Sequence, residues 1–140
     1  MTGPITTGPV ATLGVGFASA CPAEELLALA RAVVAEGGTP PPVRVATVAG
    51  RTGGQLETVA AALGAEPTYL AATDLAPWQT PTRSARSRAA TGVDSVAEAA
   101  ALAAAGPGAR LAVTRRTSRR GSCALAVTDP TATASKETST

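Results

Sequence analysis

Residues 92–106 read GVDSVAEAAALAAAG, and this stretch decides how the rest of the chain is arranged. Asp94 or Ser95 can cap the start of a helix, because a short side-chain oxygen accepts a hydrogen bond from an unpaired first-turn N–H. Gly106 follows the last apolar turn, where a left-handed residue can end the helix. Between these caps the side chains are small and apolar, with Glu98 as the one charge. We therefore expect a helix that lies close against a sheet.

The composition indicates one domain with a core of small side chains. The chain has 140 residues, of which 45% are hydrophobic but only 2% aromatic. A domain of this length can bury a substantial core, here built from Ala, Val and Leu. The sequence contains no histidine, which removes the usual general base and the commonest metal ligand. We expect neither a metal nor a cofactor.

Positive charge is concentrated in one part of the chain. The net charge is only +2, but residues 83–120 hold eight of the twelve cationic residues and just two acidic ones. The eight are Arg83, Arg86, Arg88, Arg110, Arg115, Arg116, Arg119 and Arg120. A local positive surface of this kind raises the nearby concentration of anionic ligands.

The two cysteines, Cys21 and Cys123, are too few for a zinc site or a disulfide framework. We interpret both as reduced packing residues of a cytoplasmic protein, although a helix start at Cys21 could lower the pKa of its thiol. Residues 18–21 look like a secretory cleavage site, but no Lys or Arg precedes them. No apolar run reaches transmembrane length, so no membrane contact is expected.

Strands and helices alternate along the chain. The expected elements are strands at 10–17, 43–48, 68–71, 110–114 and 123–128, and helices at 22–36, 55–63, 73–78 and 94–105. Glu24 and Glu25 suit the positive start of the first helix. This order predicts an α/β fold, a three-layer α/β/α sandwich with a mixed, mostly parallel sheet of about five strands and a C-terminal hairpin. We expect a flexible arm at 1–9, a single domain at 10–128 and a disordered tail at 129–140.

Gly14 and Gly16 lie at the end of the first expected strand, as in a dinucleotide-binding fingerprint. The third glycine and the acidic residue at the end of the second strand are missing, which disfavours nucleotide binding. The two glycines could let a ligand approach the backbone, or could simply pack the sheet. Ligands of open α/β sheets bind beyond the carboxyl ends of the strands. This rule points to residues 17–21, 49–54 and 72–78.

Glu98 and the segment RRTSRR at 115–120 each have more than one interpretation. Glu98 is either a solvated acid near the positive start of its helix or a general base or polar anchor facing a cleft. The arginine segment is a solubilising loop, a nucleic-acid contact or a clamp for a polycarboxylate. Nucleic acid is the weakest of these three, because no base-stacking aromatic residue lies near the segment in sequence.

The order of these motifs resembles the CobE/CbiG C-terminal domain family of cobalamin biosynthesis, over about residues 10–127. The resemblance rests on GVGF at 14–17, EELLAL at 24–29 and, most specifically, GVDSVAEAAAL at 92–102. It implies a three-layer α/β/α fold and a role in building the corrin ring. The long form of this family opens the δ-lactone of cobalt-precorrin-5A with loss of acetaldehyde, whereas a chain of this length is similar to the stand-alone form.

The sequence departs from the family pattern at three places. TVAGR at 47–51 lacks the acid of the usual Thr-x-Asp-x-Lys-like pattern and carries Arg51 in the basic position. A Lys that ends the fourth strand is replaced by Arg115 or Arg116, and the usual Pro-Ser reads Pro-Thr at 81–82. Positive charge and hydroxyl groups persist, so anion binding survives these changes better than acid–base chemistry.

The resemblance implies two alternative functions. In the first, the protein binds or hands on a polycarboxylate precorrin or corrinoid intermediate through its Arg-rich loops, with Phe17, Leu75 and Trp78 as an apolar wall for the ring. In the second, a small hydrolase related to cobalt-precorrin-5A hydrolase uses Glu98 as general base, and Arg51 or Arg115 holds the oxyanion.

The residues expected to contact a ligand come from several parts of the chain. They are Gly14, Gly16, Phe17, Arg51, Gly53, Trp78, Ser95, Arg115, Arg116 and Arg119. Glu98 is the candidate catalytic residue. The expected partners are the corrinoid intermediate and other enzymes of the cobalamin pathway.

Overall fold

A five-stranded sheet with β1 at its centre organises the chain. The computed structural model describes residues 9–18, 20–49, 54–75, 95–106 and 108–128. The strands are β1 (Val10–Phe17), β2 (Arg44–Val48), β3 (Glu66–Leu70), β4 (Arg110–Thr117) and β5 (Gly121–Thr128), in the spatial order β3-β2-β1-β5-β4. β1, β2 and β3 are parallel, whereas β5 is antiparallel to both β1 and β4. Four strands therefore point the same way, which confirms the predicted mixed sheet and its C-terminal hairpin.

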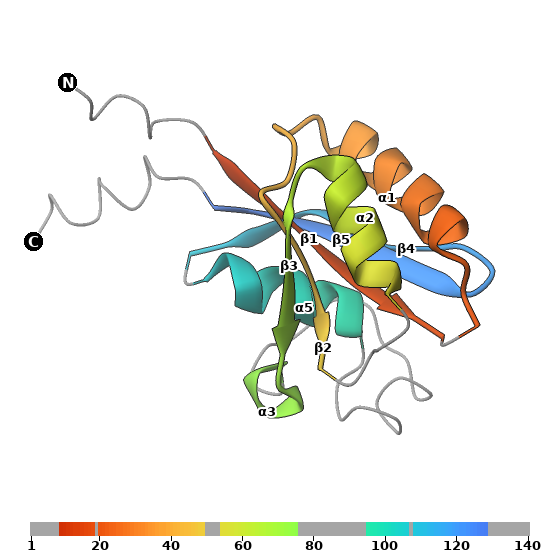
Figure 1. Ribbon diagram of the computed structural model, residues 1–140. Helices are drawn as coiled ribbons and strands as arrows, with labels where there is room; N and C mark the ends of the chain where they lie inside the picture. Colours follow the sequence, from red (N-terminus) through yellow and green to blue (C-terminus); the bar gives the residue numbers. More distant parts are fainter. Residues whose placement is uncertain (1–8, 19, 50–53, 76–94, 107, 129–140) are drawn as a thin grey trace, which may run out of the picture.

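Helices cover both faces of this sheet (Figure 1). They are α1 (Ala23–Gly37), α2 (Gln55–Leu63), α3 (Ala72–Leu75) and α5 (Val96–Ala105). Successive side chains of a strand point to opposite faces, and in β1 Leu13 and Val15 join a buried cluster with α1 and α2. Two further buried clusters place α5 on the other face, against Ala46 of β2 and Ala126 of β5. The three-layer α/β/α sandwich is confirmed.

The close approach of α5 to the sheet depends on Gly14. A Cβ atom at this position would lie 1.9 Å from the carbonyl oxygen of Ala97 and 2.6 Å from the backbone nitrogen of Ala101. Any side chain there would push the helix away from β1. The residues from Val96 to Leu102 are all buried. The small apolar helix therefore lies close against the sheet, as its sequence predicts.

The strand β3 begins two residues earlier than predicted and includes Pro67. A proline has no backbone N–H, so it weakens a strand that needs hydrogen bonds on both sides. Among the described strands, β3 lies at the edge of the sheet and pairs only with β2. An edge strand tolerates Pro67 because no second neighbouring strand requires an N–H at this position.

The basic hairpin has a shorter loop than predicted. β4 continues to Thr117 and β5 begins at Gly121, so Arg115 and Arg116 lie in a strand and not in a loop. Arg116 pairs with Cys123, and the register shifts twice along β4 before that point. Such irregularities place extra residues in one strand and redirect its side chains. The basic segment can therefore pair with β5 despite the shifts in register.

The two ends of the described domain lie side by side, because Val10 of β1 pairs with Thr128 of β5. The predicted arm, apart from residue 9, and the predicted tail at 129–140 lie outside the described residues.

Candidate functional site at the carboxyl ends of the strands

The turn between β4 and β5 lies beside the carboxyl end of β1. Phe17 pairs with Gly121, and the backbone N–H of Ala18 donates to the carbonyl oxygen of Arg120 at 3.0 Å. The guanidinium of Arg120 also reaches the carbonyl oxygen of Ala20, at 3.4 Å. These bonds bring the arginine-rich hairpin to the edge where ligands of open α/β sheets bind.

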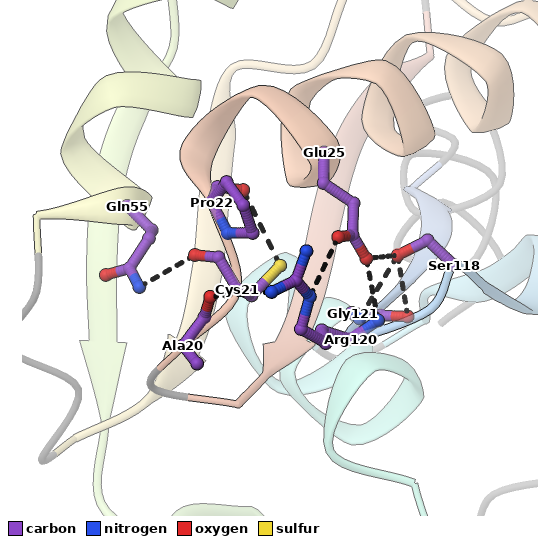
Figure 2. A network of polar contacts seen from close by, with 8 residues as sticks. All are labelled: Ala20, Cys21, Pro22, Glu25, Gln55, Ser118, Arg120 and Gly121. Carbon is purple, nitrogen blue, oxygen red and sulfur yellow. Dashed lines mark hydrogen bonds and ion pairs between the residues drawn. The ribbon is translucent and has the colours of Figure 1, made fainter.

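Glu25, in the first turn of α1, holds this hairpin turn in place (Figure 2). Its Oε2 accepts hydrogen bonds from the Ser118 hydroxyl and from the Arg120 backbone N–H, each at 2.6 Å. Its Oε1 accepts from Nε of Arg120 at 3.2 Å. The Ser118 hydrogen bond, followed by the Arg120 N–H, lowers the pKa of the Glu25 carboxyl, because both stabilise the ionised form.

The loop after β1 is joined to the start of α2 as well. Gln55 is the first residue of α2, and its Nε2 donates to the carbonyl oxygen of Cys21 at 3.0 Å (Figure 2). Burial, with a smaller contribution from Glu25, raises the pKa of the Cys21 thiol. The expectation of a lowered pKa at Cys21 is therefore wrong, because desolvation disfavours the thiolate. Burial also raises the pKa of Cys123, and both thiols are free and buried packing residues.

The four arginines at and beside the hairpin turn, Arg115, Arg116, Arg119 and Arg120, divide into two pairs. Arg116 forms a two-point ion pair with Glu36 of α1, with Nε to Oε1 at 3.1 Å, and Arg120 is bound by Glu25. Arg115 and Arg119 form no ion pair with any other residue that the structure describes. Arg119 is exposed and Arg115 half-buried. Of the three hairpin arginines predicted to bind a ligand, Arg116 is thus already engaged by a carboxylate of the protein.

Glu98 is fully buried on α5. Its Oε2 accepts the backbone N–H of Arg115 at 2.8 Å, at the second register shift of β4. Its own N–H donates to Oγ of Ser95 at 3.2 Å, so Ser95 caps the helix. The interpretation of Glu98 as a solvated surface acid is wrong. The structure gives both residues a structural bond: Glu98 fastens α5 to β4, and Ser95 starts the helix.

The residues predicted near the end of β1 pack against protein atoms. Gly14 is covered by α5, and a Cβ at Gly16 would lie 2.9 Å from Oγ of Ser122. Phe17 is 6% exposed and belongs to the core formed with α1 and α2, and Leu75 is fully buried. The structure therefore gives Phe17 and Leu75 packing roles and not an exposed apolar wall. Arg51, Gly53 and Trp78 lie outside the described residues.

Sequence reasoning missed Glu25, Ser118 and Gln55 as members of the site. Glu25 and Arg120 are 95 residues apart in the chain, and no local pattern joins an acid at a helix start to a distant turn. An acid in a first helical turn already has a sufficient explanation in the helix dipole. The TSRRG run at 117–121 is the only signal that marks the turn itself.

Among the described residues, no group of three or more Cys, Asp or Glu side chains could hold a metal ion. Within the same ranges, no helix is long and apolar enough to span a membrane.

The layers and the basic carboxyl edge define a small three-layer α/β/α domain. The family model described as "Cobalamin synthesis G C-terminus" matches residues 11–127, and the chain belongs to this family of cobalamin biosynthesis proteins. Among curated proteins, none matches the chain.

Three solved structures share the fold. The crystal structure of CobE, a protein from the cobalamin (vitamin B12) biosynthetic pathway, is 33% identical, with a TM-score of 0.79 over 85% of this chain and 93% of that one. The cobalamin biosynthesis protein chiG from Agrobacterium tumefaciens str. C58 is 26% identical, with a TM-score of 0.64 over 85% and 98%. A cobalamin biosynthesis protein G homologue from Sulfolobus solfataricus, 17% identical with a TM-score of 0.65, shares the fold over 84% of this chain but 36% of its own.

Proposed function

We propose that the protein binds a polycarboxylate precorrin or corrinoid intermediate of cobalamin biosynthesis at the carboxyl edge of the sheet and hands it on. Membership of a cobalamin biosynthesis family supports the ligand class. A corrin macrocycle that is not yet amidated carries many carboxylates, and arginine binds a carboxylate through two parallel N–H bonds. The basic hairpin is therefore suited to such a ligand.

The observation that carries the proposal is the division of the hairpin arginines. Arg116 and Arg120 are bound by Glu36 and Glu25, whereas Arg115 and Arg119 form no ion pair within the described part of the chain. An arginine in a solubilising loop needs no fixed geometry, but this turn is held to β1 and α1 by several hydrogen bonds. We infer that Arg119, with Arg115, binds ligand carboxylates, whereas Arg116 and Arg120 are already paired with carboxylates of the protein.

The alternative hydrolase function needs a base that can reach water and substrate. Glu98 is fully buried, and its Oε2 is engaged by the Arg115 N–H. This geometry favours a structural role for Glu98 over general-base chemistry. The arginines then act in binding and not in holding an oxyanion.

An absorbance titration with hydrogenobyrinic acid tests the proposal. We expect saturable binding by the wild-type protein, and much weaker binding of dicyanocobinamide, whose corresponding groups are amides. Arg119→Ala is expected to weaken binding about tenfold, because a hydrogen bond to a charged group contributes about 1.5 kcal/mol or more. Arg116→Ala is the matched control and should leave affinity nearly unchanged. Absence of binding by the wild type would contradict the proposal.

A further inference from the structure

We propose that Glu25 is a positioning residue for the ligand-binding turn: by binding the residues on both sides of Arg119, its carboxylate fixes where that arginine is presented. This inference rests on the proposed function, and it concerns a residue that does not itself contact the ligand. Arg119 stands between Ser118 and Arg120, and Glu25 accepts hydrogen bonds from both of these neighbours.

The geometry makes one carboxylate the centre of the turn. Oε2 of Glu25 receives both the Ser118 hydroxyl and the Arg120 backbone N–H at 2.6 Å, and Oε1 receives the Arg120 side chain at 3.2 Å. The Glu25 side chain is only 18% exposed, so water competes poorly for these bonds. The two residues that flank Arg119 are thus both tied to α1, and Arg120 is also bonded to Ala18, directly after β1.

Glu25 also sets the direction of the Ser118 hydroxyl. A serine hydroxyl has one proton to donate, and it goes to Glu25 at 2.6 Å, while the carbonyl oxygen of Gly121 is a poorer acceptor at 3.4 Å. The oxygen of that hydroxyl is then available to the Gly121 N–H, at 3.1 Å. The Ser118 N–H donates to the Gly121 carbonyl oxygen at 2.8 Å and completes the turn. Without Glu25 the hydroxyl loses its better acceptor, and the turn loses its link to α1.

A fixed turn matters for binding because ordering flexible groups opposes association. Immobilising a long side chain on binding lowers affinity by about two- to tenfold. A turn that is already ordered avoids part of that cost. Glu25 therefore supports affinity without contacting the ligand, and its removal should weaken binding.

The second carboxylate–arginine pair of the hairpin supplies a matched control. Glu36 binds Arg116 through two side-chain bonds only, and both side chains are about half exposed, at 45% and 44%. Within the described part of the chain, Glu36 forms no hydrogen bond with the turn or with a backbone group of β4. Loss of Glu36 removes the same charge and the same kind of ion pair, but leaves the turn held.

The test uses the sign of the change in affinity for hydrogenobyrinic acid. Removing a carboxylate makes the surface more positive, so simple electrostatics predicts that an anionic ligand binds more tightly to either variant. Positioning predicts the opposite for Glu25→Ala, about three- to tenfold weaker binding, and unchanged or slightly tighter binding for Glu36→Ala. Hydrogen exchange at the Arg120 amide should rise in Glu25→Ala and stay constant in Glu36→Ala.

Two controls separate positioning from general damage to the fold. The dissociation constants are measured well below the melting temperature of each variant, so that both are fully folded. Ser118→Ala removes one of the three bonds without changing charge, and should weaken binding by a smaller factor in the same direction. It also serves as the test if Glu25→Ala does not fold.

If the wild type binds hydrogenobyrinic acid and Glu25→Ala binds it equally or more tightly, the inference is overturned and the proposed function stands. The same holds for Ser118→Ala if Glu25→Ala does not fold. A wild-type protein that does not bind hydrogenobyrinic acid overturns the proposed function and the inference with it.

Discussion

The contact between β1 and α5 and the contact between α1 and the β4–β5 turn both join segments far apart in the chain, but with opposite chemistry. The first depends on the absence of side chains, because backbone atoms of α5 fill the space above Gly14. The second depends on charge, because Glu25 collects donors from Ser118 and Arg120. The first contact tolerates no added atom, whereas the second can lose atoms at a small cost in stability. We expect stability to depend on the first and ligand affinity on the second.

Gly14→Ala should have the largest effect on stability, because it acts on the contact between β1 and α5. The new Cβ would lie within 2.9 Å of three atoms of Ala97 and Ala101, two of them in the helix backbone. The helix must shift, and such overpacking costs about 3 kcal/mol at the upper end of its usual range. Chemical denaturation should show this loss in the free energy of unfolding.

Gly16→Ala is the control for that substitution. Its Cβ would approach Oγ of Ser122 to 2.9 Å, and its next contacts are 3.6 Å or more away. A hydroxyl can rotate where a helix backbone cannot, so we expect about 1 kcal/mol or less. Equal losses for the two glycines would mean that α5 is not held by close backbone contact.

Glu98→Ala tests the buried hydrogen bond between α5 and β4. The substitution leaves the Arg115 N–H without its acceptor, and a buried unpaired donor costs about 2 kcal/mol. We expect the free energy of unfolding to fall by that amount, and hydrogen exchange at the Arg115 amide to rise. Glu66→Ala, at an exposed position on β3, should change stability by about 0.5 kcal/mol or less. An unaffected stability in Glu98→Ala would point away from a structural role.

The sequence predicts the layers of this domain well, because they depend on local patterns. The alternation of strands and helices, and the alanine stretch with its cap, need no knowledge of distant residues. The same stretch predicts close packing against a sheet, and the partner that allows it is Gly14, 83 positions away from Ala97. From the sequence, the role of Gly14 remains one of two alternatives. Both a ligand and a packed helix can require a position without a side chain.

The candidate site is less predictable, because it depends on pairings that cross the whole chain. The cluster of arginines is visible in the sequence. The sequence does not show which of these arginines pair with carboxylates of the protein. Glu36 binds Arg116 across 80 residues and Glu25 binds Arg120 across 95. No spacing rule assigns these carboxylates to these arginines. The strand character of Arg115 and Arg116 is equally hidden, because it follows from the register with β5 and not from strand propensity.

Ser95→Ala tests the start of α5 with a smaller expected effect. The Ser95 hydroxyl accepts the Glu98 N–H, and loss of such a cap costs about 1 kcal/mol. Ser95→Gly should lower the free energy of unfolding by only about a few tenths of a kcal/mol, because glycine is itself tolerated at the N-cap position. Thermal denaturation of both variants gives the comparison. Both variants lack the hydroxyl, so wild-type stability in Ser95→Ala would show that the cap hydrogen bond does not stabilise the helix.

The pH dependence of stability gives the smallest effect and isolates the charged contact. The folded state lowers the pKa of Glu25 below its ordinary value of 4.5, chiefly through Ser118. A carboxyl with a lowered folded pKa stabilises the protein above its unfolded pKa, and that contribution is lost as the pH falls through the folded value. Glu57 also has a lowered pKa, through its bond from Tyr69, so the wild type alone does not isolate Glu25. The difference in melting temperature between wild type and Glu25→Gln should be constant above about pH 5.5 and shrink below about pH 4. A difference for Glu25→Gln that stays constant down to the lowest pH would remove Glu25 as the group that fastens the turn.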